Sequence, residues 1–290
     1  MTTIGFVGLG AMGAAIAGRL LGLENIEVYG TNRTKAKAEP LIERGMRWRD
    51  TPREVASAAD LVISMVTDDT ALAAVTGGPD GIVAGLLPGQ LYIDMSTVSP
   101  RASTDLAARV GAAGALMVDA PVSGSVPAAR DGSLAILVGG TDAAFKAASP
   151  VLSQLGNVSH VGDSGHGLLL KLAVNISLAA QMLAFSEGVL LAERGGIDRE
   201  VATKVMAATS IGSPMLRARA PLVLNLPEQA WFDIALMHKD IRLARDAGRQ
   251  EGVQLPSAVT ADTALSEAEK VGYAHRDIAG LYEVLAKASR

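Results

Sequence analysis

A glycine-rich turn close to the N-terminus constrains the fold of this chain more than any other feature. Residues 4–13 read IGFVGLGAMG, so a G-x-G-x-x-G pattern directly follows an apolar run and precedes a helical pattern at 14–21. In a strand–turn–helix unit the first glycine permits a tight turn, the second lets the backbone approach a pyrophosphate, and the third lets the helix pack closely on the strand. The alternative is a glycine turn that only joins a strand to a helix. The pattern predicts a dinucleotide site with cofactor contacts at Gly8, Leu9, Gly10, Ala11, Met12 and Gly13.

Short aliphatic or β-branched runs alternate with helical patterns through the first half of the chain. This alternation is typical of strand–helix–strand units and predicts a parallel sheet with helices on both faces, the doubly wound α/β arrangement of a Rossmann domain. The expected strands are residues 3–7, 26–29, 61–66, 91–94, 116–119 and 134–138, with one more at 158–161.

The second half of the chain is expected to be all-helical. Residues 162–167, GDSGHG, form a flexible entry to a long apolar helix that continues to about Arg194 and stops at Gly195-Gly196. We therefore expect an NADP-binding Rossmann domain at 1–164 and an all-α domain at 165–290, joined by the long helix. Further helices are expected at 199–209, 214–224, 234–251, 256–271 and 278–288.

Composition excludes several classes of function. A formal net charge of −4 without a Lys/Arg cluster leaves no electrostatic footprint for nucleic acid, and an aromatic content of 3% does not suit base stacking. With no cysteine the chain has no thiolate nucleophile or Cys-based metal site, and its four histidines lack metal-ligand spacing. We expect neither a nucleic-acid partner nor a metal.

The sequence also predicts a cytoplasmic protein without a membrane partner. The first fifteen residues lack the basic region and cleavage pattern of a signal peptide. The most apolar stretch, 168–185, has about the length of a membrane span, but it contains Lys171, Asn175, Ser177 and Gln181. Polar residues inside such a stretch favour a buried helix.

The choice between NAD and NADP is read at the end of the second expected strand, where an acidic residue would bind the ribose hydroxyls of NAD. Residues 30–34 read GTNRT there, without a carboxylate. Arg33 is suited to pair with a 2′-phosphate, assisted by Asn32 and Thr34, so the predicted cofactor is NADP. NAD use stays open, because Glu27 lies earlier in the strand and Arg33 can also be a solvated surface residue.

Three later segments stand out beside the glycine turn: 119–125 (DAPVSGS), 167–175 (GLLLKLAVN), and Phe232 with Lys239-Asp240. Together with the turn they resemble, over essentially the whole chain, the β-hydroxyacid dehydrogenase family, which includes 3-hydroxyisobutyrate dehydrogenase and tartronate semialdehyde reductase. Ser125 departs from the family's usual second glycine. Val174 stands where the related 6-phosphogluconate dehydrogenases have histidine, which disfavours that sugar-phosphate activity.

The resemblance implies a role for each matching residue. Lys171 is the expected catalytic acid/base, and Asn175, one helical turn later, is expected to orient its amine or bind the substrate oxygen. The alternatives are a lysine that extends to solvent from a half-buried face and a core amide. Substrate binding is implied for Ser123, Gly124, Ser125 and Phe232, and cofactor binding for Met65, Val66, Ser96, Thr97 and Lys239.

The expected activity is hydride transfer between NADP(H) and a small β-hydroxyacid or semialdehyde acid. Candidates are succinic semialdehyde, glyoxylate, tartronate semialdehyde and 3-hydroxyisobutyrate. An imine reductase on the same scaffold is an alternative, although such relatives carry Asp or Tyr where Lys171 stands. A catalytically silent NADP-binding module is another. Apolar faces on the predicted helices favour a homodimer or homotetramer.

Overall fold

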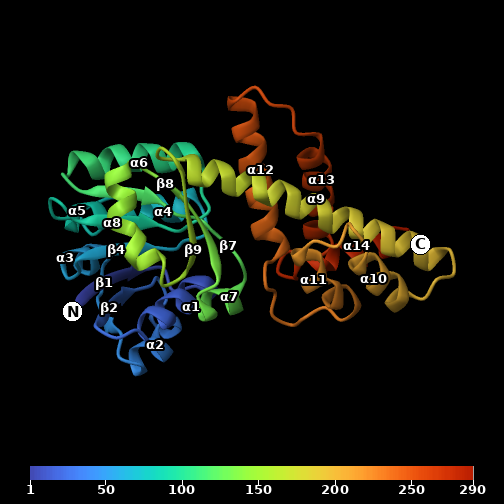
Figure 1. Cartoon of the computed structure of the whole chain (residues 1–290), viewed down its shortest axis with the longest axis horizontal. Coiled ribbons are helices and arrows are strands. Elements are labelled where there is room, and N and C mark those ends of the chain that lie inside the picture. The colour runs from blue at the N-terminus through green and yellow to red at the C-terminus, as the bar shows by residue number, and fades with distance from the viewer. Residues whose placement is uncertain (290) are drawn as a thin grey trace. The chain divides into compact units, whose positions relative to one another are not determined.

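The computed structural model describes residues 1–289 and contains two compact units, the first ending at Lys171 and the second beginning at Leu172. The first unit is an α/β domain built on one sheet (Figure 1). Its strands are β1 (Thr2–Val7), β2 (Ile26–Thr31), β3 (Arg47–Trp48), β4 (Leu61–Ser64), β5 (Leu91–Asp94), β6 (Leu116–Asp119), β7 (Val122–Ser123), β8 (Leu134–Gly139) and β9 (Gly156–Gly162). Its helices are α1 (Ala11–Leu20), α2 (Glu39–Glu43), α3 (Pro52–Ser57), α4 (Asp69–Thr76), α5 (Ile82–Gly85), α6 (Pro100–Ala112), α7 (Val126–Asp131) and α8 (Asp142–Leu152), with a 3₁₀ turn at Lys35–Lys37.

The strand order confirms the Rossmann domain predicted from the sequence. The sheet runs β3-β2-β1-β4-β5-β6-β8-β7, with β9 beside β8, and its first six strands follow the dinucleotide-binding order. The strands from β3 to β6 are parallel. The order reverses direction between β1 and β4, and ligands of open α/β sheets bind at the carboxyl ends of the strands beside such a reversal.

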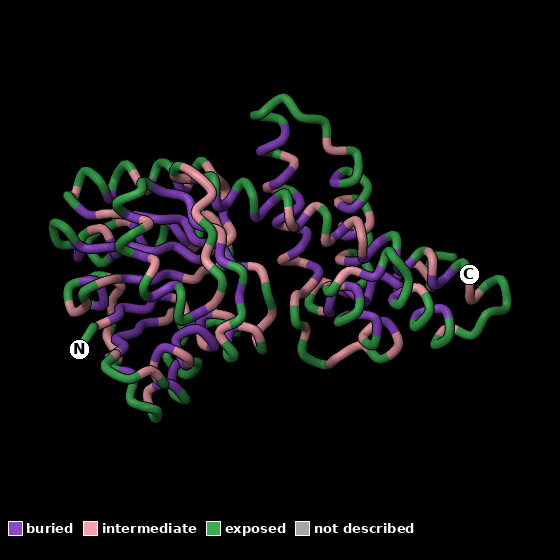
Figure 2. Tube along the Cα trace, viewed as in Figure 1, coloured by how far each residue is buried: buried purple, intermediate pink, exposed green. Residues whose placement is uncertain are grey.

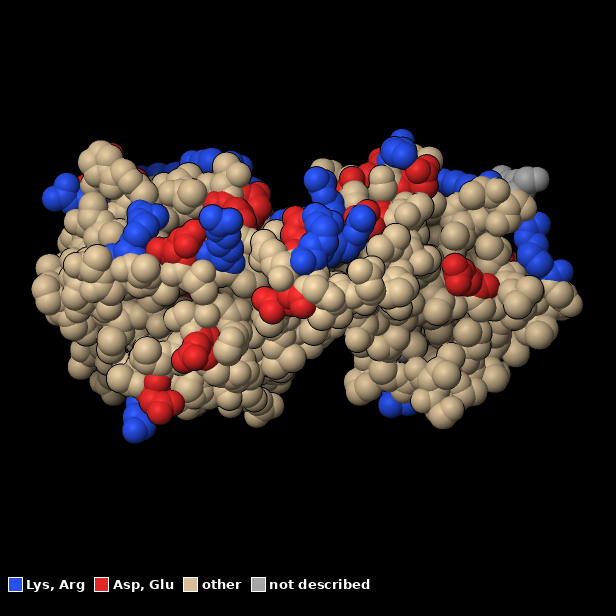
Figure 3. All heavy atoms as spheres, turned by 90° about the horizontal axis from the view of Figure 1, so that it is seen from above, with Lys and Arg blue, Asp and Glu red and all other residues tan. Residues whose placement is uncertain are grey.

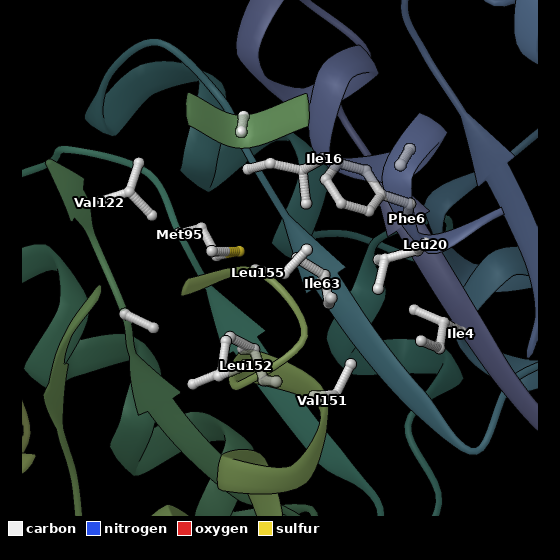
Figure 4. Packing of buried hydrophobic residues seen from close by; sticks show 14 of the residues in the cluster. Ile4, Phe6, Ile16, Leu20, Ile63, Met95, Val122, Val151, Leu152 and Leu155 are labelled. Atoms are coloured by element: carbon white, nitrogen blue, oxygen red, sulfur yellow. The ribbon is translucent and has the colours of Figure 1, made fainter. Parts of the chain in front are cut away.

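Alternate residues of each central strand pack on opposite faces of the sheet. Ile4, Phe6 and Ile63 join a cluster with α1 and α8 on one face, whereas Val62 and Tyr92 join the cluster that includes α3, α5 and α6 on the other. Figure 4 shows the first cluster, in which Phe6 lies against Ile16 and Leu20 of α1. Because both faces are covered, the central strands β1, β2, β4, β5 and β6 are mostly buried, as the purple trace in Figure 2 shows.

The last strands depart from the all-parallel sheet predicted from the alternating pattern. β8 pairs antiparallel with both β6 and β7 and parallel with β9. A parallel connection needs a crossover of a dozen or more residues, usually a helix, and α7 between β7 and β8 has only 6 residues. The chain therefore folds back on itself there. β3 and β7, each of 2 residues, were too short for the sequence pattern to predict.

The second unit is helical and has its own core. Phe185 and Val189 pack with Met237, Ile241 and Leu265 in one cluster of buried residues. The helices confirm the sequence expectation, except that the segment predicted at 278–288 begins as a 3₁₀ turn, Ile278–Gly280. They are the greater part of α9 (His166–Arg194), then α10 (Arg199–Ala208), α11 (Pro214–Leu224), α12 (Ile234–Gln250), α13 (Pro256–Lys270) and α14 (Leu281–Ala288).

The long helix α9 links the two units without a break. It has 29 residues, about 44 Å of helix, and ends where Gly196 adopts a φ of 90°. The sequence places the domain boundary at residue 164, before this helix, whereas the compact units divide within it.

Among the described residues α9 is the one helix long and apolar enough to cross a membrane, with 44% of its most apolar window buried within the chain. A helix that is apolar on all sides also suits a domain core, and α9 contains the buried polar residues Lys171 and Asn175, which are costly in a bilayer.

Candidate cofactor and catalytic site

The glycine turn between β1 and α1 has the close approaches that its three glycines predict. Gly8 has a φ of 97°, and a Cβ atom there would lie 2.2 Å from the Met65 carbonyl oxygen. A Cβ at Gly13 would lie 2.1 Å from the carbonyl oxygen of Gly8. Neither position accepts any other residue without moving the backbone.

Gly10 differs from the other two glycines because the space beside it is open. Apart from Gly10 and its two neighbours in the chain, no atom of the described residues lies within 4 Å of a Cβ built there, and no side chain of these residues caps the N-terminus of α1. The first N–H groups of a helix carry partial positive charge and need acceptors. The turn therefore suits a pyrophosphate, which would accept from those N–H groups and fill the space at Gly10.

Asn32, predicted to assist at a 2′-phosphate, links the glycine turn to the segment after β2. Its Oδ1 accepts from the Leu9 N–H at 3.0 Å, and its Nδ2 donates to the Thr34 carbonyl at 2.9 Å. The Leu9 side chain is buried in the core, and Met12 packs against the same core. These residues thus hold the shape of the turn, while Ala11 is exposed beside it.

Arg33 is exposed and forms no hydrogen bond or ion pair with any of the residues at 1–289. Glu27, the acidic residue that left NAD as an alternative cofactor, has a different partner in the structure. Its carboxylate pairs with Arg47 at 2.5 Å near the beginning of β2, four residues or about 13 Å from the carboxyl end of that strand. Residues 30–34, at the carboxyl end of β2, thus contain the positive Arg33 and no carboxylate.

A buried polar network fixes the ends of β4 and β5, where Met65, Val66, Ser96 and Thr97 were predicted to contact the cofactor. Asp94 Oδ1 accepts from the hydroxyls of Ser64 at 2.7 Å and Ser96 at 2.6 Å. Ser96 Oγ in turn accepts from the Val66 N–H at 2.9 Å. The Ser96 hydroxyl is thus used within the protein, and its position fixes the loop at Met65 and Val66.

Asp94 is fully buried, and burial raises the pKa of its carboxyl above the ordinary value, against the opposing effect of the bonds from Ser96 and Ser64. A raised pKa in the folded state means that the folded protein binds the proton of Asp94 more tightly than the unfolded chain does. The protonated carboxyl therefore stabilises the fold fully below the unfolded pKa of about 3.9, and this stabilisation is lost as the pH rises through the folded pKa.

We expect Asp94→Asn to remove this pH dependence. From about pH 4 upward, the free energy of unfolding of the natural protein should fall relative to that of the variant, because asparagine does not ionise. Urea unfolding between about pH 4 and 8 measures the difference, with the exposed Asp105→Asn as control. Parallel curves for the natural protein and Asp94→Asn would contradict it.

Ser123, Gly124 and Ser125 form the turn from β7 into α7. Gly124 has a φ of 147°, and a Cβ there would lie 2.7 Å from Leu134 Cδ2. Both serines are partly exposed, and neither hydroxyl has a hydrogen-bond partner among residues 1–289. Hydroxyl groups without a partner in the protein are suited to donate hydrogen bonds to a carboxylate.

Helix α9 carries Lys171 and Asn175 one turn apart, at 7% and 0% exposure. Asn175 Nδ2 donates to Asp240 Oδ2 at 2.6 Å, which fixes the orientation of the amide because a carboxylate only accepts. Asp240 Oδ1 lies 2.8 Å from the Lys239 ammonium. One carboxylate of α12 thus holds the amide of Asn175 and the cation of Lys239.

Asp240 is a candidate site residue that the sequence pattern identifies only as half of the Lys239-Asp240 pair. The signal was present in the helical pattern, because Asp240 occupies the buried face of α12 together with Met237, Ile241 and Ala244. A carboxylate within such an apolar face needs polar partners inside the protein.

Phe232 precedes α12 in a segment held by Asp277. Oδ2 of Asp277 accepts from the N–H groups of Trp231 at 2.9 Å and Phe232 at 3.2 Å. The Ile278 N–H donates to the Phe232 carbonyl at 3.1 Å. The ring itself is partly buried and packs against the helical core.

The predicted site residues fall into one group in each unit. The first unit holds the glycine turn, the ends of β2, β4 and β5, the turn at 123–125 and Lys171, and the second holds Asn175, Phe232 and Lys239. No cluster of His, Asp or Glu able to hold a metal occurs among residues 1–289. On the face in Figure 3, Lys/Arg and Asp/Glu side chains are interspersed, without a broad basic surface.

Comparison with known proteins finds relatives that match nearly the whole chain. Residues 3–162 match the NAD binding domain of 6-phosphogluconate dehydrogenase, and residues 165–285 match the NAD-binding family of NADP-dependent 3-hydroxyisobutyrate dehydrogenase. Glyoxylate/succinic semialdehyde reductase 2 of Arabidopsis thaliana is 32% identical over 98% of this chain and 79% of its own. The 2-(hydroxymethyl)glutarate dehydrogenase of Eubacterium barkeri is 31% identical over 97% of this chain and 94% of its own. The structure of Mycobacterium tuberculosis 3-hydroxyisobutyrate dehydrogenase with L-serine superposes with a TM-score of 0.86, at 29% identity, over 98% of this chain and 99% of that one.

Proposed function

The chain belongs to the β-hydroxyacid dehydrogenase family of NAD(P)-dependent oxidoreductases, and we propose that it interconverts a small β-hydroxyacid and the matching semialdehyde acid with NADP(H). Lys171 is the proposed acid/base. The observation that carries the proposal is a buried lysine on an apolar helix, one turn from an asparagine whose amide is fixed by a buried carboxylate.

The proposed chemistry assigns a proton transfer to Lys171. A bound nicotinamide supplies or accepts the hydride. In reduction the ammonium of Lys171 donates a proton to the alkoxide oxygen, and in oxidation the neutral amine removes the proton from the hydroxyl. Asn175 orients this exchange, and Asp240 holds its amide in one orientation.

The turn at Ser123–Ser125 supports an acid as substrate. Its two unengaged hydroxyls suit a carboxylate, and a backbone held at a φ of 147° at Gly124 presents them from a fixed turn. The relatives named above act on glyoxylate, succinic semialdehyde or 2-(hydroxymethyl)glutarate, all of which are small acids with an aldehyde or hydroxyl group. We therefore propose an acid of this size, and Ser125 as a residue that selects among such acids.

The proposed preference for NADP rests on Arg33. The residue is exposed at the carboxyl end of β2, and Glu27, which could have served NAD, is paired with Arg47 at the other end of the strand. A guanidinium binds a phosphate with two parallel hydrogen bonds.

Replacing Arg33 by alanine is expected to reduce the preference for NADPH over NADH by about 10- to 100-fold, because a hydrogen bond to a charged group contributes about 1.5–3 kcal/mol. The ratio of kcat/KM for the two cofactors measures the change. Lys146→Ala, an exposed lysine on α8, serves as control. An unchanged ratio would show that the 2′-phosphate is recognised elsewhere.

We also propose that the protein associates into a homodimer or homotetramer, which sedimentation velocity tests. Val201 and Val205, one turn apart on α10, are each more than half exposed, and so are Ile197 just before that helix and Leu191 of α9. Several exposed apolar residues in one part of a chain indicate an interface.

The activity itself is tested by the consumption of NADPH, and separately of NADH, with a panel of small aldehyde acids and cyclic imines. Turnover of an aldehyde acid supports the proposal. Turnover of imines alone would favour an imine reductase, and cofactor binding without any turnover would favour a silent NADP-binding module.

A further inference from the structure

The N-terminus of α9 has no cap in its own sequence. The first helical hydrogen bond runs from the Leu169 N–H to the Gly165 carbonyl at 2.9 Å, so Gly165 is the N-cap residue and Leu168 is the third residue of the helix. The N-cap residue of a helix is usually Ser, Thr, Asp or Asn, and the third helical residue is often Glu or Gln, because their side chains accept from free backbone N–H groups. Neither glycine nor leucine offers a side-chain acceptor.

Asp119, at the end of β6, supplies both missing acceptors. Its Oδ1 accepts from the Gly165 N–H at 2.7 Å, and its Oδ2 accepts from the Leu168 N–H at 3.0 Å. The residues are 46 and 49 positions away in the sequence, and Asp119 is 1% exposed. In a capping box two side chains of the helix itself accept from these two N–H groups. Here one carboxylate from the sheet accepts from both.

Two glycines leave the space that this carboxylate occupies. A Cβ at Gly139 would lie 2.6 Å from Asp119 Oδ1, and a Cβ at Gly167 would lie 2.7 Å from Oδ2. β8 and the first turn of α9 therefore both close tightly around Asp119. Burial raises the pKa of Asp119, and the bonds from Gly165 and Leu168 oppose that rise by favouring the carboxylate.

The contact joins two parts of the candidate site. Lys171 follows Leu168 by three residues, about 4.5 Å along the helix axis. In the other direction, the turn at Ser123–Ser125 begins four residues after Asp119. A contact that fixes the first turn of α9 against β6 therefore also fixes Lys171 relative to the turn at Ser123–Ser125.

We propose that Asp119 is a positioning residue, a long-range cap that sets where α9 begins and so places Lys171 relative to the turn at Ser123–Ser125. The proposal rests on the function proposed above for Lys171. Asp119 itself touches no reacting atom in this scheme and acts through the helix. Its carboxylate is specifically required, because both oxygens accept from backbone N–H groups.

Hydrogen exchange tests the cap directly. In Asp119→Ala, the amides of Gly165 and Leu168 are expected to exchange at least tenfold faster, because each loses its acceptor. Asp119→Asn keeps the volume and one carbonyl oxygen, so one of the two amides should lose protection even if the alanine variant does not fold. Asp198→Ala removes the N-cap of α10, a helix that carries no site residue, and serves as the matched control. Unchanged exchange at Gly165 and Leu168 in both Asp119 variants would overturn the proposal.

Two further measurements separate positioning from a purely structural role. For Asp119→Asn we expect kcat to fall at least tenfold with the Kd of NADPH within about twofold, since small displacements of a catalytic group are costly. The rate of Lys171 acetylation by acetic anhydride, read by mass spectrometry, should rise relative to exposed Lys204. In Asp198→Ala, kcat and the rate of Lys171 acetylation should both stay unchanged.

Faster amide exchange without a change in kcat or in Lys171 acetylation would reduce Asp119 to a structural cap and overturn the positioning role. If the natural protein turns over no acid of the panel, the proposed function fails, and exchange and acetylation still decide whether Asp119 positions Lys171.

Discussion

Replacing Lys171 by alanine is expected to lower kcat by about 10²- to 10⁴-fold, the usual contribution of a positioned acid/base. The side chain is buried on α9, whereas the glycine turn that suits the pyrophosphate is built from Gly8, Gly10 and Gly13 and does not involve it. The Kd of NADPH should therefore stay within about twofold, since phosphate contacts at a helix N-terminus persist. Single-turnover rates and cofactor titration measure the two quantities.

The control for this substitution is Lys204→Ala, which removes an exposed lysine of α10 that pairs with Glu200. It should leave both kcat and the Kd of NADPH unchanged. If Lys171→Ala keeps full turnover, Lys171 is not the acid/base. If cofactor binding is lost together with turnover, the residue supports the cofactor site rather than the proton transfer.

The second large effect is expected for Asp240→Ala. This change removes the acceptor that fixes the Asn175 amide and the carboxylate beside the Lys239 ammonium. Breaking a buried ion pair costs about 3–5 kcal/mol, and because Lys239 is 23% exposed we expect a smaller loss of about 2–4 kcal/mol in the free energy of unfolding. kcat should fall as well, since Asn175 loses its orientation. Urea unfolding and steady-state kinetics measure the two effects.

Two variants make the Asp240 prediction specific. Asp240→Asn keeps an oxygen for Asn175 but loses the charge beside Lys239, so it should retain more activity than the alanine variant. Asp246→Ala, on the exposed side of the same helix, removes only a surface pair with Arg249 and should change stability by no more than about 0.5 kcal/mol. Equal stability of Asp240→Ala and Asp246→Ala would refute the role given to Asp240.

Features that depend on neighbouring residues could be predicted from the sequence. The glycine turn after β1, the apolar runs of β2, β4, β5 and β6, the C-terminal end of α9 and both ends of α11 follow from glycine, proline and apolar spacing within a few residues. A helix satisfies its backbone by bonds four residues apart, and a buried strand shows as a short apolar run, so both leave local patterns. The pattern did not reveal the direction of β8, because strand direction depends on whether α7 is long enough to cross the sheet.

The sequence by itself determined the dinucleotide-binding fold, the helical second unit and the family, because these follow from local turn chemistry, periodicity and motifs. Only the tertiary structure decided which polar groups meet. Asn32 lies 23 residues from Leu9, Asp119 lies 46 residues from Gly165, and Asn175 lies 65 residues from Asp240. A buried polar group must find a partner inside the protein, but that partner is selected by how strands and helices pack, and no spacing along the chain encodes it.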